Sequence, residues 1–162
     1  MLIRAAKIED TEPVLALLQR SIIELCEADH KSDPDALASW LANKTSEVYR
    51  AWLTNDQLIS FVVEDEQAIA GFGMATTDGE VLLNYVLPEF RFNGVSKAVL
   101  AKIEQSLLGL GVEEARLWST ETAHVFYQSR GWKDRGAPEI EHGMRSFPMS
   151  KFLGLTGSRD EY

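Results

Sequence analysis

One stretch in the middle of the chain constrains the fold most, because it joins an apolar run, a short basic turn and an amphipathic helix pattern. The apolar run covers residues 81–86, and the helical repeat extends from residue 94 to residue 110. A further β-rich run follows at 115–119. A strand, a helix and a second strand in this order form a crossover that makes the two strands parallel. The sequence therefore predicts a sheet with at least one parallel pair.

Hydrophobic periodicity predicts the elements around this crossover. The expected helices cover residues 10–27, segments that begin near 33 and 45, the central segment 94–110 and 122–130. The apolar stripe of the central helix consists of Val95, Val99, Ile103, Leu107 and Leu110. The other expected strands cover residues 2–6, 58–64, 68–77, a run from 132 onward, and 145–152.

Short polar links at 64–67 and 77–80 predict hairpins, and hairpins pair their strands antiparallel. The expected fold class is therefore α/β, with a mixed, mainly antiparallel sheet of six to seven strands and helices on both faces. Residues 1–152 are expected to form a single domain, and residues 153–162 a loose tail.

Charge and composition exclude several classes of protein. The chain has 162 residues and a formal net charge of -9, so non-specific nucleic-acid binding is not expected. Its single cysteine, Cys26, excludes an intramolecular disulfide. No run approaches the roughly 18 apolar residues of a membrane helix, and the N-terminus lacks an apolar signal region. We therefore expect a cytoplasmic protein that does not bind membranes.

The turn before the central helix has the features of an anion site. Backbone N–H groups at a helix N-terminus lack intrahelical partners, and the helix dipole places positive charge there. Arg91 and Lys97 add full positive charges on either side of the turn. Phosphate or pyrophosphate is the expected ligand. The alternative is an ordinary connection in which Gly94 serves only to allow positive φ.

Three motifs then resemble the GNAT superfamily of acyl-CoA-dependent N-acyltransferases. The family signature is Arg or Gln, two residues, Gly, one residue, then Gly or Ala. The matching segment here is Arg91-Phe92-Asn93-Gly94-Val95-Ser96, in which Ser96 replaces the final Gly or Ala. The segments Ile3-Arg4-Ala5-Ala6 and Phe126-Tyr127-Gln128-Ser129-Arg130-Gly131-Trp132 are similar to the family's first strand and late Tyr–Gly–aromatic pattern.

The resemblance implies where acetyl-CoA would bind. The N–H groups from Phe92 through Asn93, Gly94, Val95 and Ser96 to Lys97 would hold the pyrophosphate. Strand-edge backbone of Asn84, Tyr85 and Val86 would pair with the pantetheine arm, because the family separates its fourth and fifth strands. Thr120 and Phe126 are the further cofactor contacts that it implies.

Amine attack on a thioester requires loss of a proton from the amine and a proton for the departing thiolate. Tyr127 matches the general acid of the family, with a packing tyrosine as the alternative. The strand 81–86 contains no carboxylate that would serve as the base, and Asn84 can only orient water. Glu121 and His124 lie near the last helix, and His30 follows the first. For His30 we favour a loop or surface role.

The other candidate residues are assigned structural rather than functional roles. The spacing of Cys26 and His30 matches no common zinc pattern, so no metal is expected. Cys26 is interpreted as a small packing residue rather than a nucleophile. Four aromatic residues are assigned to the core rather than to an acceptor pocket. They are Trp40, Tyr49, Trp52 and Trp118.

These observations predict an N-acetyltransferase that moves an acetyl group directly from acetyl-CoA to a primary amine in a small molecule, peptide or lysine. Acidic residues on the first helices favour a small cationic amine. They are Glu24, Glu27, Asp29, Asp33 and Asp35. The alternative is a catalytically inactive acyl-CoA sensor or interaction module. A nucleotide-binding protein is ranked last, because both common nucleotide-binding glycine motifs are absent. The resemblance also allows a homodimer.

Overall fold

The computed structural model describes residues 1–154. Its helices are α1 (Thr11–Leu25), α2 (Glu27–His30), α3 (Pro34–Leu41), α4 (Ser46–Thr54), α5 (Val95–Gly109) and α6 (His124–Ser129). Two 3₁₀ turns, η1 (Ile8–Asp10) and η2 (Pro88–Phe90), precede α1 and α5. The strands are β1 (Leu2–Ala5), β2 (Leu58–Asp65), β3 (Ala68–Thr76), β4 (Glu80–Val86), β5 (Glu114–Ser119), β6 (Lys133–Asp134), β7 (Glu139–Glu141) and β8 (Met144–Phe152).

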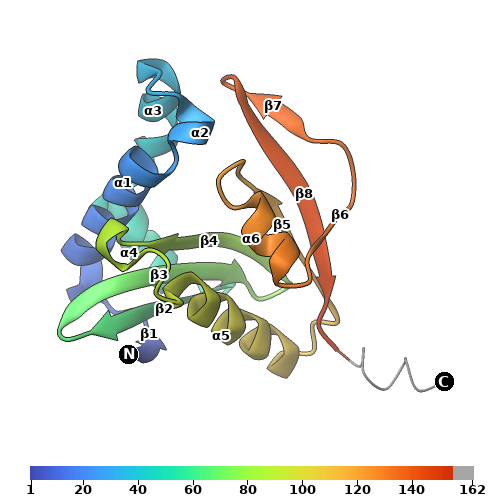
Figure 1. Ribbon diagram of the computed structural model, residues 1–162. Helices are drawn as coiled ribbons and strands as arrows, with labels where there is room; N and C mark the ends of the chain where they lie inside the picture. Colours follow the sequence, from blue (N-terminus) through green and yellow to red (C-terminus); the bar gives the residue numbers. More distant parts are fainter. Residues whose placement is uncertain (155–162) are drawn as a thin grey trace.

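The strands form one sheet in the order β1-β2-β3-β4-β5-β8-β6, and β7 pairs with β8 (Figure 1). Only the β4–β5 pair is parallel, because α5 crosses over between those strands. The expected mixed, mainly antiparallel sheet is therefore confirmed. Its eight strands exceed the expected six to seven, because β7 is a three-residue strand whose residues are all exposed. Such a strand leaves no alternation of apolar and polar residues.

Helices cover both faces of the sheet, and each face has its own core. On one face, α5 packs Val99, Ile103 and Leu107 against the strands. On the other face, α1 and α4 pack Leu17, Leu18 and Tyr49 against β2 and β3. The stripe expected on α5 is correct except at its end. Leu110 follows the last helical turn and is 56% exposed.

Two glycines in β3 allow α5 to lie close to the sheet. A Cβ atom at Gly71 would lie 2.5 Å from Val95 Cγ1, and one at Gly73 would lie 2.2 Å from Val99 Cγ1. Both distances are far inside van der Waals contact, so no larger residue fits without displacing the helix. The glycines thus set the position of α5, and with it the position of the α5 N-terminus.

The first helical segment differs from expectation. A single helix was expected over 10–27, but α1 ends at Leu25 and α2 forms a separate turn that ends at Lys31 with φ 52°. The caps of the next two helices agree with the sequence. Asp33 accepts a hydrogen bond from the Ala36 N–H at 3.1 Å, and Thr45 accepts one from the Val48 N–H at 3.3 Å.

The described chain ends on the sheet. The Leu153 N–H donates to the Glu113 carbonyl oxygen at 2.7 Å, which holds the chain beside the start of β5. The remainder of the expected tail, residues 155–162, lies outside the described residues. Within residues 1–154, no helix is both long and apolar enough to cross a membrane.

A buried ion pair joins β1 to the start of α1. Both guanidinium NH groups of Arg4 donate to the Asp10 carboxylate at 2.8 Å, and the Lys7 N–H donates to it at the same distance. Asp10 is buried. These hydrogen bonds, with that of Arg4 the largest cause, lower the pKa of Asp10. The carboxylate therefore stabilises the fold at neutral pH, and this contribution is lost as the pH falls through the pKa of folded Asp10.

We expect Asp10→Asn to lower the free energy of unfolding by about 1–3 kcal/mol at pH 7, because it replaces the charged acceptor of the Arg4 and Lys7 hydrogen bonds with a neutral side chain, while Arg4 keeps Glu64 as a second partner. The wild-type advantage over this variant should shrink as the pH falls below 3.8, the ordinary pKa of Asp, toward the lowered pKa of folded Asp10. Urea unfolding of both proteins at pH 7 and at a series of pH values below 3.8 measures this. The exposed Asp56→Asn serves as the control and should leave the free energy of unfolding unchanged.

Candidate active site

A cleft opens where β4 and β5 separate. Their pairing is limited to Glu80 with Arg116 and Val81 with Leu117, at the start of β4. Beyond these two pairs the strands diverge, so one edge of residues 82–86 has no strand partner among the described residues. The expected separation of the fourth and fifth strands is thus present.

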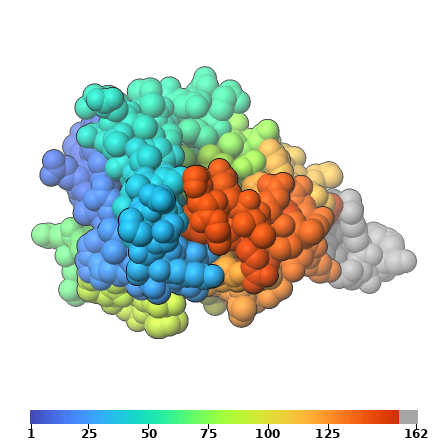
Figure 2. Space-filling model, turned by 90° about the horizontal axis from the view of Figure 1, so that it is seen from above, coloured from blue at the N-terminus to red at the C-terminus, as the bar shows by residue number. Residues whose placement is uncertain are grey.

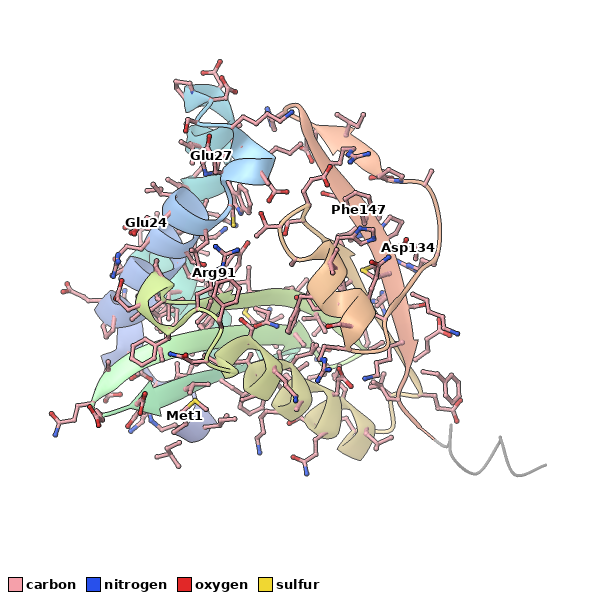
Figure 3. The ribbon with its side chains drawn as sticks, viewed as in Figure 1. Met1, Glu24, Glu27, Arg91, Asp134 and Phe147 are labelled. Atoms are coloured by element: carbon pink, nitrogen blue, oxygen red, sulfur yellow. The ribbon has the colours of Figure 1, made fainter. Side chains whose placement is uncertain are left out.

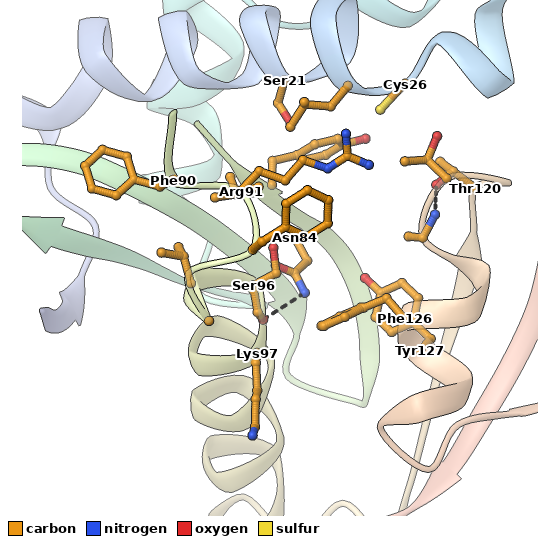
Figure 4. Close-up of a pocket in the computed structure, with 18 of the residues that line it drawn as sticks. Ser21, Cys26, Asn84, Phe90, Arg91, Ser96, Lys97, Thr120, Phe126 and Tyr127 are labelled. Atoms are coloured by element: carbon orange, nitrogen blue, oxygen red, sulfur yellow. Dashed lines mark hydrogen bonds between the residues drawn. The ribbon is translucent and has the colours of Figure 1, made fainter. Parts of the chain in front are cut away.

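A pocket of about 290 Å³ occupies this cleft (Figure 4). Its walls come from α1, β4, the turn before α5, the end of β5 and α6. The pocket includes every cofactor-binding residue expected from the sequence except Asn93, and also Tyr127. Those residues are Asn84, Tyr85, Val86, Arg91, Phe92, Gly94, Val95, Ser96, Lys97, Thr120 and Phe126.

The turn before α5 presents several free backbone donors. The Asn93 N–H donates to the Phe90 carbonyl at 3.2 Å and is therefore not free, contrary to the expectation for this one group. Within residues 1–154, the N–H groups of Phe92, Gly94, Val95, Ser96 and Lys97 donate to no backbone carbonyl.

Backbone geometry and charge at this turn favour an anion. Phe92 and Gly94 have positive φ angles of 68° and 80°, and successive N–H groups in such a turn form an anion-binding concavity. The first turn of α5 holds Lys97 and no carboxylate. Ser96, which stands where the family signature has Gly or Ala, leaves the turn intact.

Asn84 lies on β4 opposite this turn. Its side-chain amide donates to the Ser96 carbonyl at 3.3 Å (Figure 4). Its other atom, Oδ1, is buried and has no hydrogen-bond partner among the described residues. Leaving a buried acceptor unsatisfied costs about 1–3 kcal/mol. Asn84 therefore offers an acceptor to a ligand that brings an N–H group into the cleft.

Tyr127 lies on α6 across the cleft from Asn84. Its ring packs against Phe126 and Trp132, with centroids 5.3 and 6.0 Å away. Burial raises the pKa of Tyr127 to about 12, and the neighbouring Asn84 side chain opposes this shift without overcoming it. The phenol therefore keeps its proton throughout the neutral pH range. Thr120 supports the start of α6, since its hydroxyl accepts from the Ala123 N–H at 3.1 Å.

The far end of the pocket joins α1 to the loop after β5. Ser21, Leu25 and Cys26 face this end, and Thr122 lies opposite them. Asp29 is 4% exposed and ties the two sides together. Its carboxylate accepts from the Glu121 N–H at 2.6 Å and from the N–H and hydroxyl of Thr122. One buried side chain thus ties the α1 end of the cleft to the loop after β5.

The histidines are not candidate bases. His30 was expected in a loop or on the surface, but it is 2% exposed. Its Nε2 lies 2.9 Å from the Ile22 carbonyl oxygen, and its Nδ1 accepts from the Ser32 N–H at 2.9 Å. Both nitrogens are therefore used within the fold. His124 stacks on Phe147 and contacts Asp134 at 2.7 Å, outside the pocket. No carboxylate or histidine lines the pocket among the described residues.

The core assignment of the aromatic residues is correct for Tyr49 and wrong for Trp118. Tyr49 is fully buried, and Trp52 packs beside it on Phe72. Trp118 is 43% exposed and lines the pocket. The alternation of β5 holds the signal for this, because Ala115 and Leu117 point to the core and Trp118 points the other way. Trp40 is half-buried and packs edge-on against His30.

Two buried groups have higher pKa values in the folded protein than in the unfolded chain, and this predicts a loss of stability at alkaline pH. Burial raises the pKa of the Cys26 thiol from 9.0 to about 12 and that of Tyr127 to about 12. The unfolded chain therefore loses these protons first, and stability falls as the pH rises above 9. The Cys26 shift alone should lower the free energy of unfolding by about 2 kcal/mol between pH 8.5 and 10.5. Burial also raises the pKa values of Tyr49, Tyr85 and Tyr127, and these tyrosines should add to the fall.

Urea unfolding under reducing conditions at these two pH values checks this. Cys26→Ser removes the thiol and should make this fall about 2 kcal/mol smaller than in the wild type, while the contribution of the buried tyrosines remains. An equal fall in the variant and the wild type would contradict the assignment to Cys26.

Comparison with known proteins agrees with this geometry. The sequence model of the acetyltransferase (GNAT) domain matches residues 28–153. A comparison with curated protein sequences found no significant match.

Solved structures of N-acetyltransferases share the fold. A GCN5-related N-acetyltransferase from Rhodopseudomonas palustris superposes with a TM-score of 0.83 at 18% identity, covering 94% of this chain and 95% of that one. PaiA N-acetyltransferase from Thermoplasma acidophilum, solved with coenzyme A, gives 0.77 at 21% identity, covering 94% and 99%. The ribosomal-protein-S18-alanine N-acetyltransferase from Escherichia coli gives 0.69 at 15% identity, covering 96% of each chain.

Proposed function

Because the chain belongs to the GNAT acetyltransferase family, we propose that it transfers an acetyl group from acetyl-CoA to a primary amine. One observation carries the proposal: free N–H groups at the α5 N-terminus and an unpaired β4 edge face the same cleft. This combination suits a ligand that has a pyrophosphate at one end and an amide-containing arm at the other. The structure of a relative with coenzyme A supports the choice of cofactor.

The donor and acceptor groups of the cleft fit such a cofactor. The N–H groups of Phe92, Gly94, Val95, Ser96 and Lys97 would hold the pyrophosphate, and the Lys97 ammonium would add charge. The β4 edge at Asn84, Tyr85 and Val86 would pair with the pantetheine arm. The unsatisfied Asn84 Oδ1 is well suited to accept from one of its amides. Thr120 and Phe126 would form the opposite wall.

Acetyl-CoA supplies a thioester that amines attack directly. Tyr127 would then donate from its hydroxyl to the departing sulfur, because its raised pKa keeps that proton in place. The developing oxyanion would accept from backbone N–H groups at the cleft edge. In a direct transfer no protein nucleophile takes part. The buried Cys26 thiol would not serve as one, because its pKa is raised to about 12 and it stays protonated.

The pocket residues described here include no general base, so the amine would have to reach the thioester already deprotonated. After the attack, the nitrogen would release its extra proton to water, and Tyr127, having given its proton to the sulfur, would regain one from solvent. The rate should therefore rise with pH until the acceptor amine has lost its proton. An amine of low pKa, such as a peptide α-amino group at about 7.7–8.0, would need the least help.

The test is calorimetric titration with acetyl-CoA, followed by an amine screen that detects the released thiol. Micromolar binding together with turnover would support the proposal, and ADP and NAD serve as control ligands. Binding without turnover of any amine would favour the second candidate, an acyl-CoA sensor, which the missing base motivates. Absence of binding would contradict both.

A further inference from the structure

The two charged residues in the pocket lining of the described chain lie at opposite ends. Lys97 and Arg91 are both cationic. Lys97 belongs to the first turn of α5, beside the free N–H groups. The Arg91 side chain leaves the same turn in the other direction and extends toward Ser21 and Cys26 (Figure 4). Its guanidinium therefore lies at the end of the cleft formed by α1, near Ser21 and Cys26.

The Arg91 guanidinium has no anionic partner within residues 1–154. It makes no hydrogen bond or ion pair there, and its one ring contact is with Phe92, 4.7 Å from the centroid. A guanidinium remains charged at all relevant pH values, and its fork of N–H groups matches a carboxylate in two parallel hydrogen bonds. Arg91 is thus an unused bidentate donor that faces the space where an acceptor would bind.

The nearby carboxylates are already engaged. Glu24 and Glu89 both pair with Arg20. Asp29 accepts from the backbone of the loop after β5, and Glu121 pairs with Arg145. Figure 3 shows Glu24 and Glu27 on the helices above Arg91. The acidic helices therefore leave no carboxylate in the pocket lining to attract a cation, and the preference for a small cationic amine loses its basis.

We propose that the acceptor is a primary amine that also carries a carboxylate, and that Arg91 binds this carboxylate. The inference rests on the proposed acetyl transfer and specifies its substrate class. The surrounding wall is neutral, with Leu25, Tyr85 and Trp118 among its residues. Arg91 itself is exposed, so its guanidinium is open to a ligand that enters the cleft. The amine end of the acceptor would then point along the cleft toward Tyr127.

The experiment compares amino acids with the corresponding amino acid amides, which keep the amine and side chain and lose only the negative charge. Thiol release from acetyl-CoA gives kcat/KM for each member of a pair. We expect the acid to exceed the amide by at least about tenfold, the effect of losing a charged hydrogen-bond pair. Amides have the less basic amine, so any difference in amine protonation works against this expectation.

Arg91→Gln should bring the acid-to-amide ratio close to one, and Arg91→Lys should give an intermediate ratio because it keeps the charge without the fork. Lys97→Gln is the matched control. It should raise the KM for acetyl-CoA and leave the acid-to-amide ratio as in the wild type.

Two outcomes would overturn this inference alone. A wild-type ratio near one would do so, and so would an Arg91→Gln variant that raises the KM for acetyl-CoA while keeping the wild-type ratio, since that assigns the guanidinium to the cofactor. Calorimetry separates these results from failure of the proposed function. If acetyl-CoA binds but the enzyme shows no preference for the acid, only this inference is overturned. If acetyl-CoA does not bind, the proposed function is overturned as well.

Discussion

Tyr127→Phe should lower kcat about 100-fold, the lower range for loss of a positioned proton donor. The change removes one oxygen atom and keeps the ring that packs between Phe126 and Trp132. The fold and the acetyl-CoA affinity should therefore persist, and the dissociation constant should change less than about threefold. Steady-state kinetics and calorimetry on the same preparation measure both quantities.

The matched control is Tyr49→Phe, which removes the same atom from a tyrosine outside the cleft. The Tyr49 hydroxyl donates to the Lys7 carbonyl at 2.8 Å. Its loss should cost about 1 kcal/mol of stability and leave kcat unchanged. In the wild type, kcat should not decline between pH 8 and 10, because the pKa of Tyr127 is raised to about 12. Equal kcat values for Tyr127→Phe and the wild type would remove Tyr127 from the mechanism.

Gly73→Ala should lower the free energy of unfolding by about 3 kcal/mol, the upper range for overpacking in a close-packed core. The new Cβ would lie 2.2 Å from Val99 Cγ1 and 2.9 Å from Ile103 Cδ1, both on α5. Relief requires α5 to move away from β3, which also displaces the N–H groups at its N-terminus. Acetyl-CoA should therefore bind at least about tenfold more weakly, a loss of about 1.4 kcal/mol.

Two companion variants separate this packing effect from a general effect of glycine replacement. Adding Val99→Ala to Gly73→Ala removes the nearest clashing atom and should recover part of the acetyl-CoA affinity. Gly109→Ala lies in α5 with nothing within 4 Å of the new Cβ, and should stabilise the protein by about 0.5–1 kcal/mol. Urea unfolding and calorimetry test the set. Wild-type stability in Gly73→Ala would mean that the β3 glycines do not fix the helix.

Local sequence was sufficient to predict the turn that leads into α5. The turn at Gly94 and the start of α5 depend on neighbouring residues, because φ preferences and helix caps act over a few positions. The parallel placement of β4 and β5 follows from the crossover between them. Tyr127 was found from a motif that also places Gly131, with φ 89°, at the end of α6.

The α1 end of the cleft depends on contacts between distant residues, and these have no local signal. Asp29 and Glu121 are 92 positions apart, yet the carboxylate of one holds the backbone of the other. His30 became buried because a backbone carbonyl and a backbone N–H satisfy its two nitrogens, which composition does not reveal. The direction of the Arg91 side chain was likewise unpredictable, since the same residue type suits either end of the cleft.

The way the two halves of the sheet are joined has a mechanical consequence. Strands β1–β4 and strands β5–β8 are joined within the sheet by only two residue pairs, both between β4 and β5. Helix α5 connects the two halves on one side, and the hydrogen bonds of Asp29 connect them on the other. Figure 2 shows α2 and α3 next to the β7–β8 hairpin, beside the Asp29 contact. A ligand bound between β4 and β5 would contact both halves, so separation of the two strands should become rarer when the cleft is filled. Hydrogen exchange in β5 should slow on binding even though much of that strand is remote from the pocket.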